Sequence, residues 1–197
     1  MTRIFRTASS ARGQAMVEMA ICLPLVTILA LGVSEFGYAL LDAHVVTKMT
    51  REASNLISRD TTISDAVVAM RSMATRPVNF DDGSSKIIFS VVKRVNTSGA
   101  ANFNQNVLYQ RFVYGSYTGT SKITTSGAGS FAGPPNYQAN NSDNDTNLRV
   151  TNFPPNLLVT PGDFIYVTEI FTRHQRLTPL DHFGIVVPTT LYSIAYF

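Results

Sequence analysis

The sequence contains no tryptophan, one cysteine and few charged residues. Because Cys22 is the single cysteine, an internal disulfide is excluded, and any domain outside a membrane must fold by burying apolar side chains. Charged residues make up 15% of the chain and hydrophobic residues 45%, a balance on the apolar side for a soluble domain. The composition therefore directs attention to long apolar segments.

Metal-ligand patterns are also missing. The three histidines, His44, His174 and His182, are not spaced as ligands of one ion, although the last two lie near Glu169 and Asp181 in sequence. The Asp143 and Asp145 pair lacks the glycine and the closing glutamate of a calcium-binding EF-hand loop. We interpret these residues as ordinary polar side chains and predict no metal site.

No stretch of the chain matches a catalytic or cofactor-binding motif. G-x-S-x-G, C-x-x-C, H-E-x-x-H and a phosphate-cradling glycine loop are all missing, and the glycines of 127–133 are scattered among serine, alanine and phenylalanine. We therefore expect a protein that is not an enzyme and that has no cofactor.

The excess of positive charge is confined to the amino terminus. Arg3, Arg6 and Arg12 account for the net charge of +3, since the other 13 basic residues equal the 13 acidic ones. This distribution argues against nucleic-acid binding, which requires a basic surface. Arginines ahead of an apolar segment instead place the amino terminus in the cytoplasm.

An apolar run from Met16 to Leu41 follows these arginines. Its uncharged part, from Met19 to Ser34, is shorter than the ~20 residues of a full membrane span, but the length suffices if Glu18 and Glu35 lie near opposite interfaces. A cleaved secretory signal, cut after Ala39 in Gly-Tyr-Ala, is the alternative interpretation.

The rest of the chain predicts an α+β domain with an antiparallel sheet. Apolar residues at helical spacing from Leu41 to Leu56 extend the membrane helix as an amphipathic helix, and a second helix is expected over 63–74. Four segments rich in β-branched and aromatic residues predict strands, with their aromatic side chains on one face: 86–95, 107–117, 163–173 and 189–197. A long Gly/Ser/Thr/Asn-rich connection spans 118–147.

The stretch RGQAMVEMAICLPLVTILALGVSEFGYAL resembles the start of TadE-like minor pseudopilins of Tad (Flp) pilus systems. The resemblance implies cleavage by a prepilin peptidase between Gly13 and Gln14, which makes Glu18 the fifth residue of the mature chain. Pro24 corresponds to a proline that loosens the helix in that family. The triplet Glu35, Phe36 and Gly37 corresponds to the exit from the membrane.

The resemblance also implies a division into a leader (1–13), a transmembrane and amphipathic helix (14–58) and an extracytoplasmic domain (59–197). The expected location is the inner membrane, with one span and the carboxyl-terminal domain in the periplasm or in an extracellular pilus. The expected partners are the prepilin peptidase, sibling minor pseudopilins, the major Flp-type pilin and an inner-membrane assembly platform. Met19 stands where related major pilins have an aromatic residue, which argues against a major-pilin role.

Two other functions are consistent with the sequence. One is a pseudopilin of a type II-like secretion system, and the other is a membrane-anchored binding or adhesive domain outside any filament. A filament subunit and a simple membrane anchor differ in the role of Glu18. In a filament its carboxylate neutralises the new amino group of a neighbouring subunit, because a buried charge is tolerated when paired. In a simple anchor it extends to the headgroup boundary.

Overall fold

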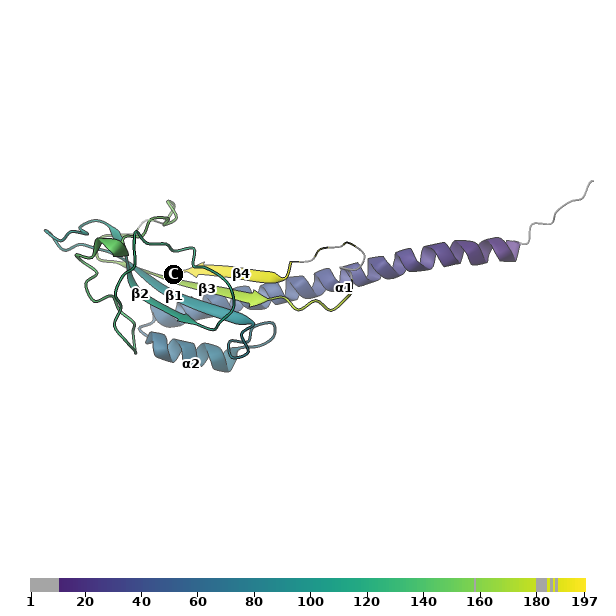
Figure 1. Ribbon diagram of the computed structural model, residues 1–197, viewed down its shortest axis with the longest axis horizontal. Helices are drawn as coiled ribbons and strands as arrows, with labels where there is room; N and C mark the ends of the chain where they lie inside the picture. Colours follow the sequence, from purple (N-terminus) through teal and green to yellow (C-terminus); the bar gives the residue numbers. More distant parts are fainter. Residues whose placement is uncertain (1–10, 158, 180–183, 185, 187) are drawn as a thin grey trace, which may run out of the picture. The chain divides into compact units, whose positions relative to one another are not determined.

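The computed structural model describes residues 11–157, 159–179, 184, 186 and 188–197 (Figure 1). The chain divides into two compact units. The first consists of residues 1–40 and 176–187, and the second of residues 41–175 and 188–197. The sequence places the start of the extracytoplasmic domain at residue 59, whereas the second unit includes the helix from Leu41 onward.

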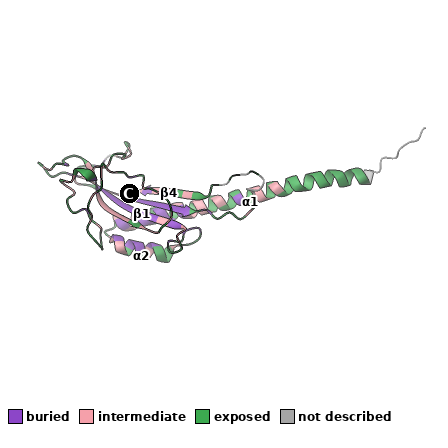
Figure 2. Cartoon of the chain, viewed as in Figure 1, coloured by how far each residue is buried: buried purple, intermediate pink, exposed green. Residues whose placement is uncertain are grey.

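Helix α1 (Ala11–Ser58) is continuous through the apolar run and the amphipathic segment, as predicted. Its amino-terminal part exposes almost every large apolar side chain, and Figure 2 shows this part as an exposed helix. It is long and apolar enough to cross a membrane. From Val46 onward one face of α1 is buried, through Met49, Ala53 and Ile57. The same helix thus has a lipid-compatible half and a half that contributes to a folded core.

Helix α2 (Ile63–Met73) matches the predicted second helix. Thr62 caps it, since its hydroxyl accepts a hydrogen bond from the backbone N–H of Asp65 at 3.1 Å. Its buried residues are Ile63, Ala66, Val67 and Met70. Met73, which the helical spacing places on the same face, is 45% exposed because it lies at the last position of the helix.

The four predicted strands form one antiparallel sheet in the order β2-β1-β3-β4. Their bounds are β1 (Ser85–Arg94), β2 (Asn106–Tyr114), β3 (Phe164–Arg173) and β4 (Thr190–Tyr196). Strand β2 ends earlier than predicted because Gly115 has a φ of +90°, and a Cβ there would lie 2.3 Å from the carbonyl oxygen of Ser85.

The first face of the sheet packs against both helices. Ile87 and Phe89 of β1 and Ile170 of β3 are fully buried in one cluster with the buried residues of α1 and α2. The hydroxyl of Ser54 on α1 also donates to the carbonyl oxygen of Ala195 on β4 at 3.2 Å. The second half of α1 is therefore part of the core of this unit.

The second face of the sheet is covered by the long connection between β2 and β3. Ile123, Ala139 and Leu148 of this connection are buried in a second cluster with Val92 and Val167. A short 3-10 helix, η1 (Thr146–Leu148), lies within it. The segment predicted as a long polar loop is thus a packed layer of the domain.

The expectation that the aromatic side chains share one face of the sheet is wrong. Phe112 and Tyr166 pack against the helix-side cluster, whereas Tyr196 packs against the cluster beneath the connection. Successive side chains of a strand point to opposite faces, so Tyr166 and Phe171 on β3 cannot lie on the same side. Both faces of the sheet carry apolar side chains, because the helices cover one face and the β2–β3 connection covers the other.

Candidate functional site

Every residue assigned to processing or assembly from the sequence lies on α1. Gly13 and Gln14 lie near its start and are exposed. The peptide bond between them is therefore close to the helix end and accessible in this unit.

Glu18 is exposed on an otherwise apolar surface. Met16, Val17 and Met19 beside it are 75%, 60% and 68% exposed. The Glu18 carboxylate accepts a hydrogen bond of 3.0 Å from the side-chain amide of Gln14, one helical turn earlier. An amide donor leaves the negative charge in place, so this carboxylate is available to a cation from another molecule.

Pro24 lies inside α1 without ending it. Proline has no backbone N–H, so one hydrogen bond of the helix is missing at this turn. The nearby hydroxyls are satisfied within the helix, because Thr27 donates to the carbonyl oxygen of Leu23 at 2.8 Å and Ser34 to that of Ala30 at 2.9 Å. A segment with its hydroxyls bonded internally is compatible with hydrocarbon.

Glu35 is the residue whose surroundings the sequence did not predict. Its side chain is buried, with the residue 1% exposed, although α1 is largely exposed around it. Its Oε2 accepts hydrogen bonds from the backbone N–H of Leu177 at 3.1 Å, the N–H of Thr178 at 2.9 Å and the hydroxyl of Thr178 at 2.7 Å. Phe36 and Gly37, the other members of the triplet, are exposed.

These hydrogen bonds change the length that the span can have. With the Glu35 carboxylate satisfied by donors of its own chain, the apolar segment extends from Met19 to Leu41. About 23 residues at 1.5 Å per residue give ~34 Å, enough for a hydrocarbon core of ~30 Å. The uncharged stretch to Ser34 alone corresponds to only ~24 Å.

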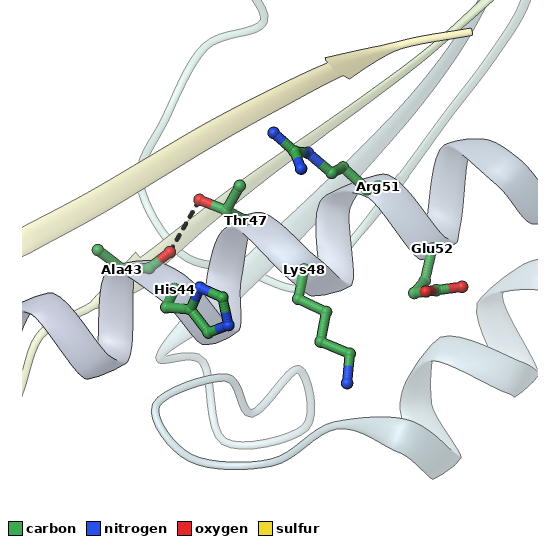
Figure 3. A pocket seen from close by; sticks show the side chains of 6 residues that line it. All are labelled: Ala43, His44, Thr47, Lys48, Arg51 and Glu52. Carbon is green, nitrogen blue, oxygen red and sulfur yellow. Dashed lines mark hydrogen bonds between the residues drawn. The ribbon is translucent and has the colours of Figure 1, made fainter.

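A groove of about 490 Å³ lies on α1 after the apolar run (Figure 3). The residues that line it are Ala43, His44, Thr47, Lys48, Arg51 and Glu52. All of them come from this one helix, and in Figure 3 Arg51 extends from the side of the helix opposite to Lys48 and Glu52. An open groove with charges of both signs and no second wall fits a solvated helix surface better than a ligand site.

The other polar residues considered as ligands have structural partners. His174 is buried, with its Nδ1 2.8 Å from a carboxylate oxygen of Asp42. Asp143 accepts hydrogen bonds from Lys93 Nζ at 3.0 Å and from the hydroxyl of Thr97 at 2.7 Å, and these lower the pKa of Asp143. Asp145 caps η1.

No group of three or more His, Cys, Asp or Glu side chains that could hold a metal ion is found among the residues that the structure describes. His182 and Asp181 lie outside that part of the chain.

Glu169 on β3 is a second buried carboxylate that sequence patterns did not single out for this role. It is 0% exposed and accepts hydrogen bonds from the backbone N–H of Lys122 at 2.7 Å, from Tyr192 Oη at 2.9 Å and from Ser121 Oγ. Burial and the nearby Glu169 raise the pKa of Tyr192 strongly. The network fastens the covering connection to the sheet, which is a structural role.

Comparison with known proteins finds a similarity in the amino-terminal segment. A family model described as "TadE-like protein" matches residues 13–55, the part of α1 that holds Glu18, Pro24 and Glu35. No curated protein and no solved structure matches the chain. The predicted resemblance to TadE-like proteins is confirmed, and the match supports a protein associated with a Tad pilus.

Proposed function

We propose that this chain, TadE-like over residues 13–55, is a minor pseudopilin that primes or tunes assembly of a Tad/Flp-type pilus. The observation that carries the proposal is the surface of α1. An apolar helix face with one exposed acid, Glu18, is suited to insertion among the apolar helices of other subunits. The sheet domain is the part that distinguishes this subunit from a pilin that is little more than a helix.

Processing by a prepilin peptidase between Gly13 and Gln14 is part of the proposal. Cleavage removes all three leader arginines and creates a positive amino group at Gln14. Before cleavage, these arginines hold the amino terminus in the cytoplasm and place the sheet domain in the periplasm. The triplet Glu35, Phe36 and Gly37 then lies near the periplasmic end of the span.

Glu18 is proposed to pair with the amino terminus of an adjacent subunit. In an apolar bundle an unpaired ammonium group is costly, and leaving one partner of a buried ion pair alone costs ~3–5 kcal/mol. Pro24 contributes differently, because one missing hydrogen bond makes the helix easier to bend while it leaves the bilayer. The proposed partners are the sibling minor pseudopilins, the major pilin, the prepilin peptidase and the assembly platform.

The test is pilus formation in cells that carry Glu18→Ala or Glu18→Gln. Both variants are expected to be inserted and cleaved, but pilus number and co-purification of sibling subunits should fall severely. The glutamine variant should fail nearly as badly, because an amide cannot cancel the charge of an ammonium group. Glu52→Ala removes an exposed acid of the same helix beyond the apolar run and serves as the matched control, with normal pili expected.

Normal piliation with a cleaved Glu18→Ala protein would rule out the pairing role. The mature amino terminus, measured by mass spectrometry, separates the remaining alternatives. A start at Gln14 supports a pseudopilin, a start at Met1 or Thr2 supports a simple membrane anchor, and a start at Leu40 indicates a secretory signal peptidase. A type II-like secretion role would leave piliation unchanged and reduce protein export.

A further inference from the structure

The connection between β3 and β4 returns to α1 at Glu35. Leu177 and Thr178, which follow β3, give Glu35 three hydrogen bonds of 2.7–3.1 Å within the unit formed by residues 1–40 and 176–187. Two of these donors are backbone N–H groups, so the position of the main chain itself is determined, whatever side chains it carries.

Glu35 lies inside the apolar run and not at its end. It precedes Leu41 by six positions, which corresponds to ~9 Å along the helix axis. Around it, Val33, Phe36 and Leu40 are 74%, 60% and 72% exposed, so the other sides of α1 are open to lipid. An attachment point at this level brings the connection to the bilayer if α1 spans it.

The covered side of α1 extends further toward the amino terminus. Ile28 and Leu31 are half-buried, whereas Leu29 and Val33 on other sides are exposed. Ile28, Leu31 and Glu35 are spaced by three and four positions and therefore share one face of the helix. The other segment of the same compact unit is 176–187.

The connection itself exposes apolar side chains. Leu177, whose backbone N–H is bonded to Glu35 of the apolar helix, is 46% exposed, and Val186 is 89% exposed. Exposure of apolar side chains to water is unfavourable. Beside a membrane span these side chains can instead be buried in the acyl region below the headgroups.

We infer that the side chains of Leu177 and Val186, two described residues between β3 and β4, enter the periplasmic interface of the bilayer beside α1. The protein would then contact the membrane both through the span and through these two side chains. Glu35 would determine how deeply the two side chains enter the bilayer. The depth of ~9 Å agrees with the ~5–10 Å by which interfacial apolar surfaces are buried. The inference rests on the proposed span of α1.

The missing tryptophan makes a direct test possible, because one introduced indole is the single tryptophan of the chain. Full-length Val186→Trp and Leu177→Trp are reconstituted in vesicles of phosphatidylethanolamine and phosphatidylglycerol. Lipids brominated either near the headgroup or near the chain end are then added. Both variants should emit at shorter wavelength than tryptophan in water, with stronger quenching by the shallow bromines.

Two control variants are measured in the same way. Phe103→Trp, at a position of the sheet unit that is 45% exposed and so matches Leu177, should emit as in water and resist quenching. Leu29→Trp, in the middle of the apolar run, should be quenched most by the deep bromines. Adding Glu35→Ala to Val186→Trp should reduce its quenching, because the hydrogen bonds that hold the connection are lost.

The outcomes are distinguishable. If Leu177→Trp and Val186→Trp behave like Phe103→Trp while Leu29→Trp is quenched, the span stands and the interfacial contact is refuted. If Leu29→Trp is not quenched either, the span itself fails, and this inference fails with it. Unchanged quenching of Val186→Trp in the Glu35→Ala background would refute the role of Glu35 in setting the depth.

Discussion

We expect that a fragment starting at Arg59 does not fold. A fragment starting at Leu41 is expected to fold. The reason is that the second half of α1 belongs to the core of the sheet unit. Val46, Met49, Ala53 and Ile57 are 1%, 7%, 0% and 3% exposed and form one cluster with α2 and the first face of the sheet. A cut at residue 59 removes all four.

The size of the loss follows from the side chains involved. Full burial of a valine, methionine or isoleucine contributes ~1.5–3 kcal/mol each, so these three contribute roughly 5–9 kcal/mol before Ala53 is counted. A domain of this size is stable by ~5–15 kcal/mol. The fragment from Arg59 would therefore lose most or all of its free energy of unfolding, and Ile63 and Phe89 would face water.

The assay is urea unfolding of the fragments 41–197 and 59–197, followed by circular dichroism. The longer fragment should unfold cooperatively, and Met49→Ala within it should cost ~2–5 kcal/mol. Lys48→Ala, which removes an exposed side chain beside it, is the control and should leave the midpoint unchanged. Cooperative unfolding of 59–197 at the midpoint of 41–197 would refute the reasoning.

Three further predictions concern the sheet unit, each measured by the urea midpoint of fragment 41–197. Glu169→Ala should lower the free energy of unfolding by ~1–3 kcal/mol, since three hydrogen-bond donors lose their acceptor, and an unchanged midpoint would contradict the network. Above about pH 10, the ordinary pKa of tyrosine, stability should decline, because Tyr192 ionises when unfolded but stays neutral when folded. Tyr192→Phe should make that decline shallower, and an identical pH profile would exclude Tyr192 as its source. Gly115→Ala should cost more than about 1 kcal/mol, because of its φ of +90° and the contact with the Ser85 carbonyl; a midpoint equal to that of the parent would contradict this.

The elements that the sequence predicted are those governed by local chemistry. Helix α2 has a threonine cap and apolar residues at helical spacing, and it appears where they indicate. The strands are rich in β-branched and aromatic residues, and each is found within a few residues of its predicted bounds. The end of β2 was missed because it depends on the approach of Gly115 to Ser85, a contact between two strands.

What the sequence did not predict depends on contacts between distant residues. Glu35 and Thr178 are 143 positions apart, and nothing in the spacing of either indicates the other. The polar composition of 118–147 predicted only a long connection, yet Ile123 and Ala139 within it and Leu148 just after it are buried in one cluster with residues of the sheet. Glu35 and Glu169 are both buried and accept hydrogen bonds from backbone N–H groups of residues distant in sequence, Thr178 and Lys122 respectively.

The layer over the second face of the sheet has a consequence for how this protein can diversify. Strand β1 is buried from Ile87 to Val92, on one side by the helices and on the other by the covering connection. It therefore has no solvent side on which substitutions are neutral, and a mutational scan should find it intolerant at consecutive positions. Related chains that recognise different partners would have to vary elsewhere, in the β2–β3 connection and in the edge strands β2 and β4. The sequence of β1 would change more slowly.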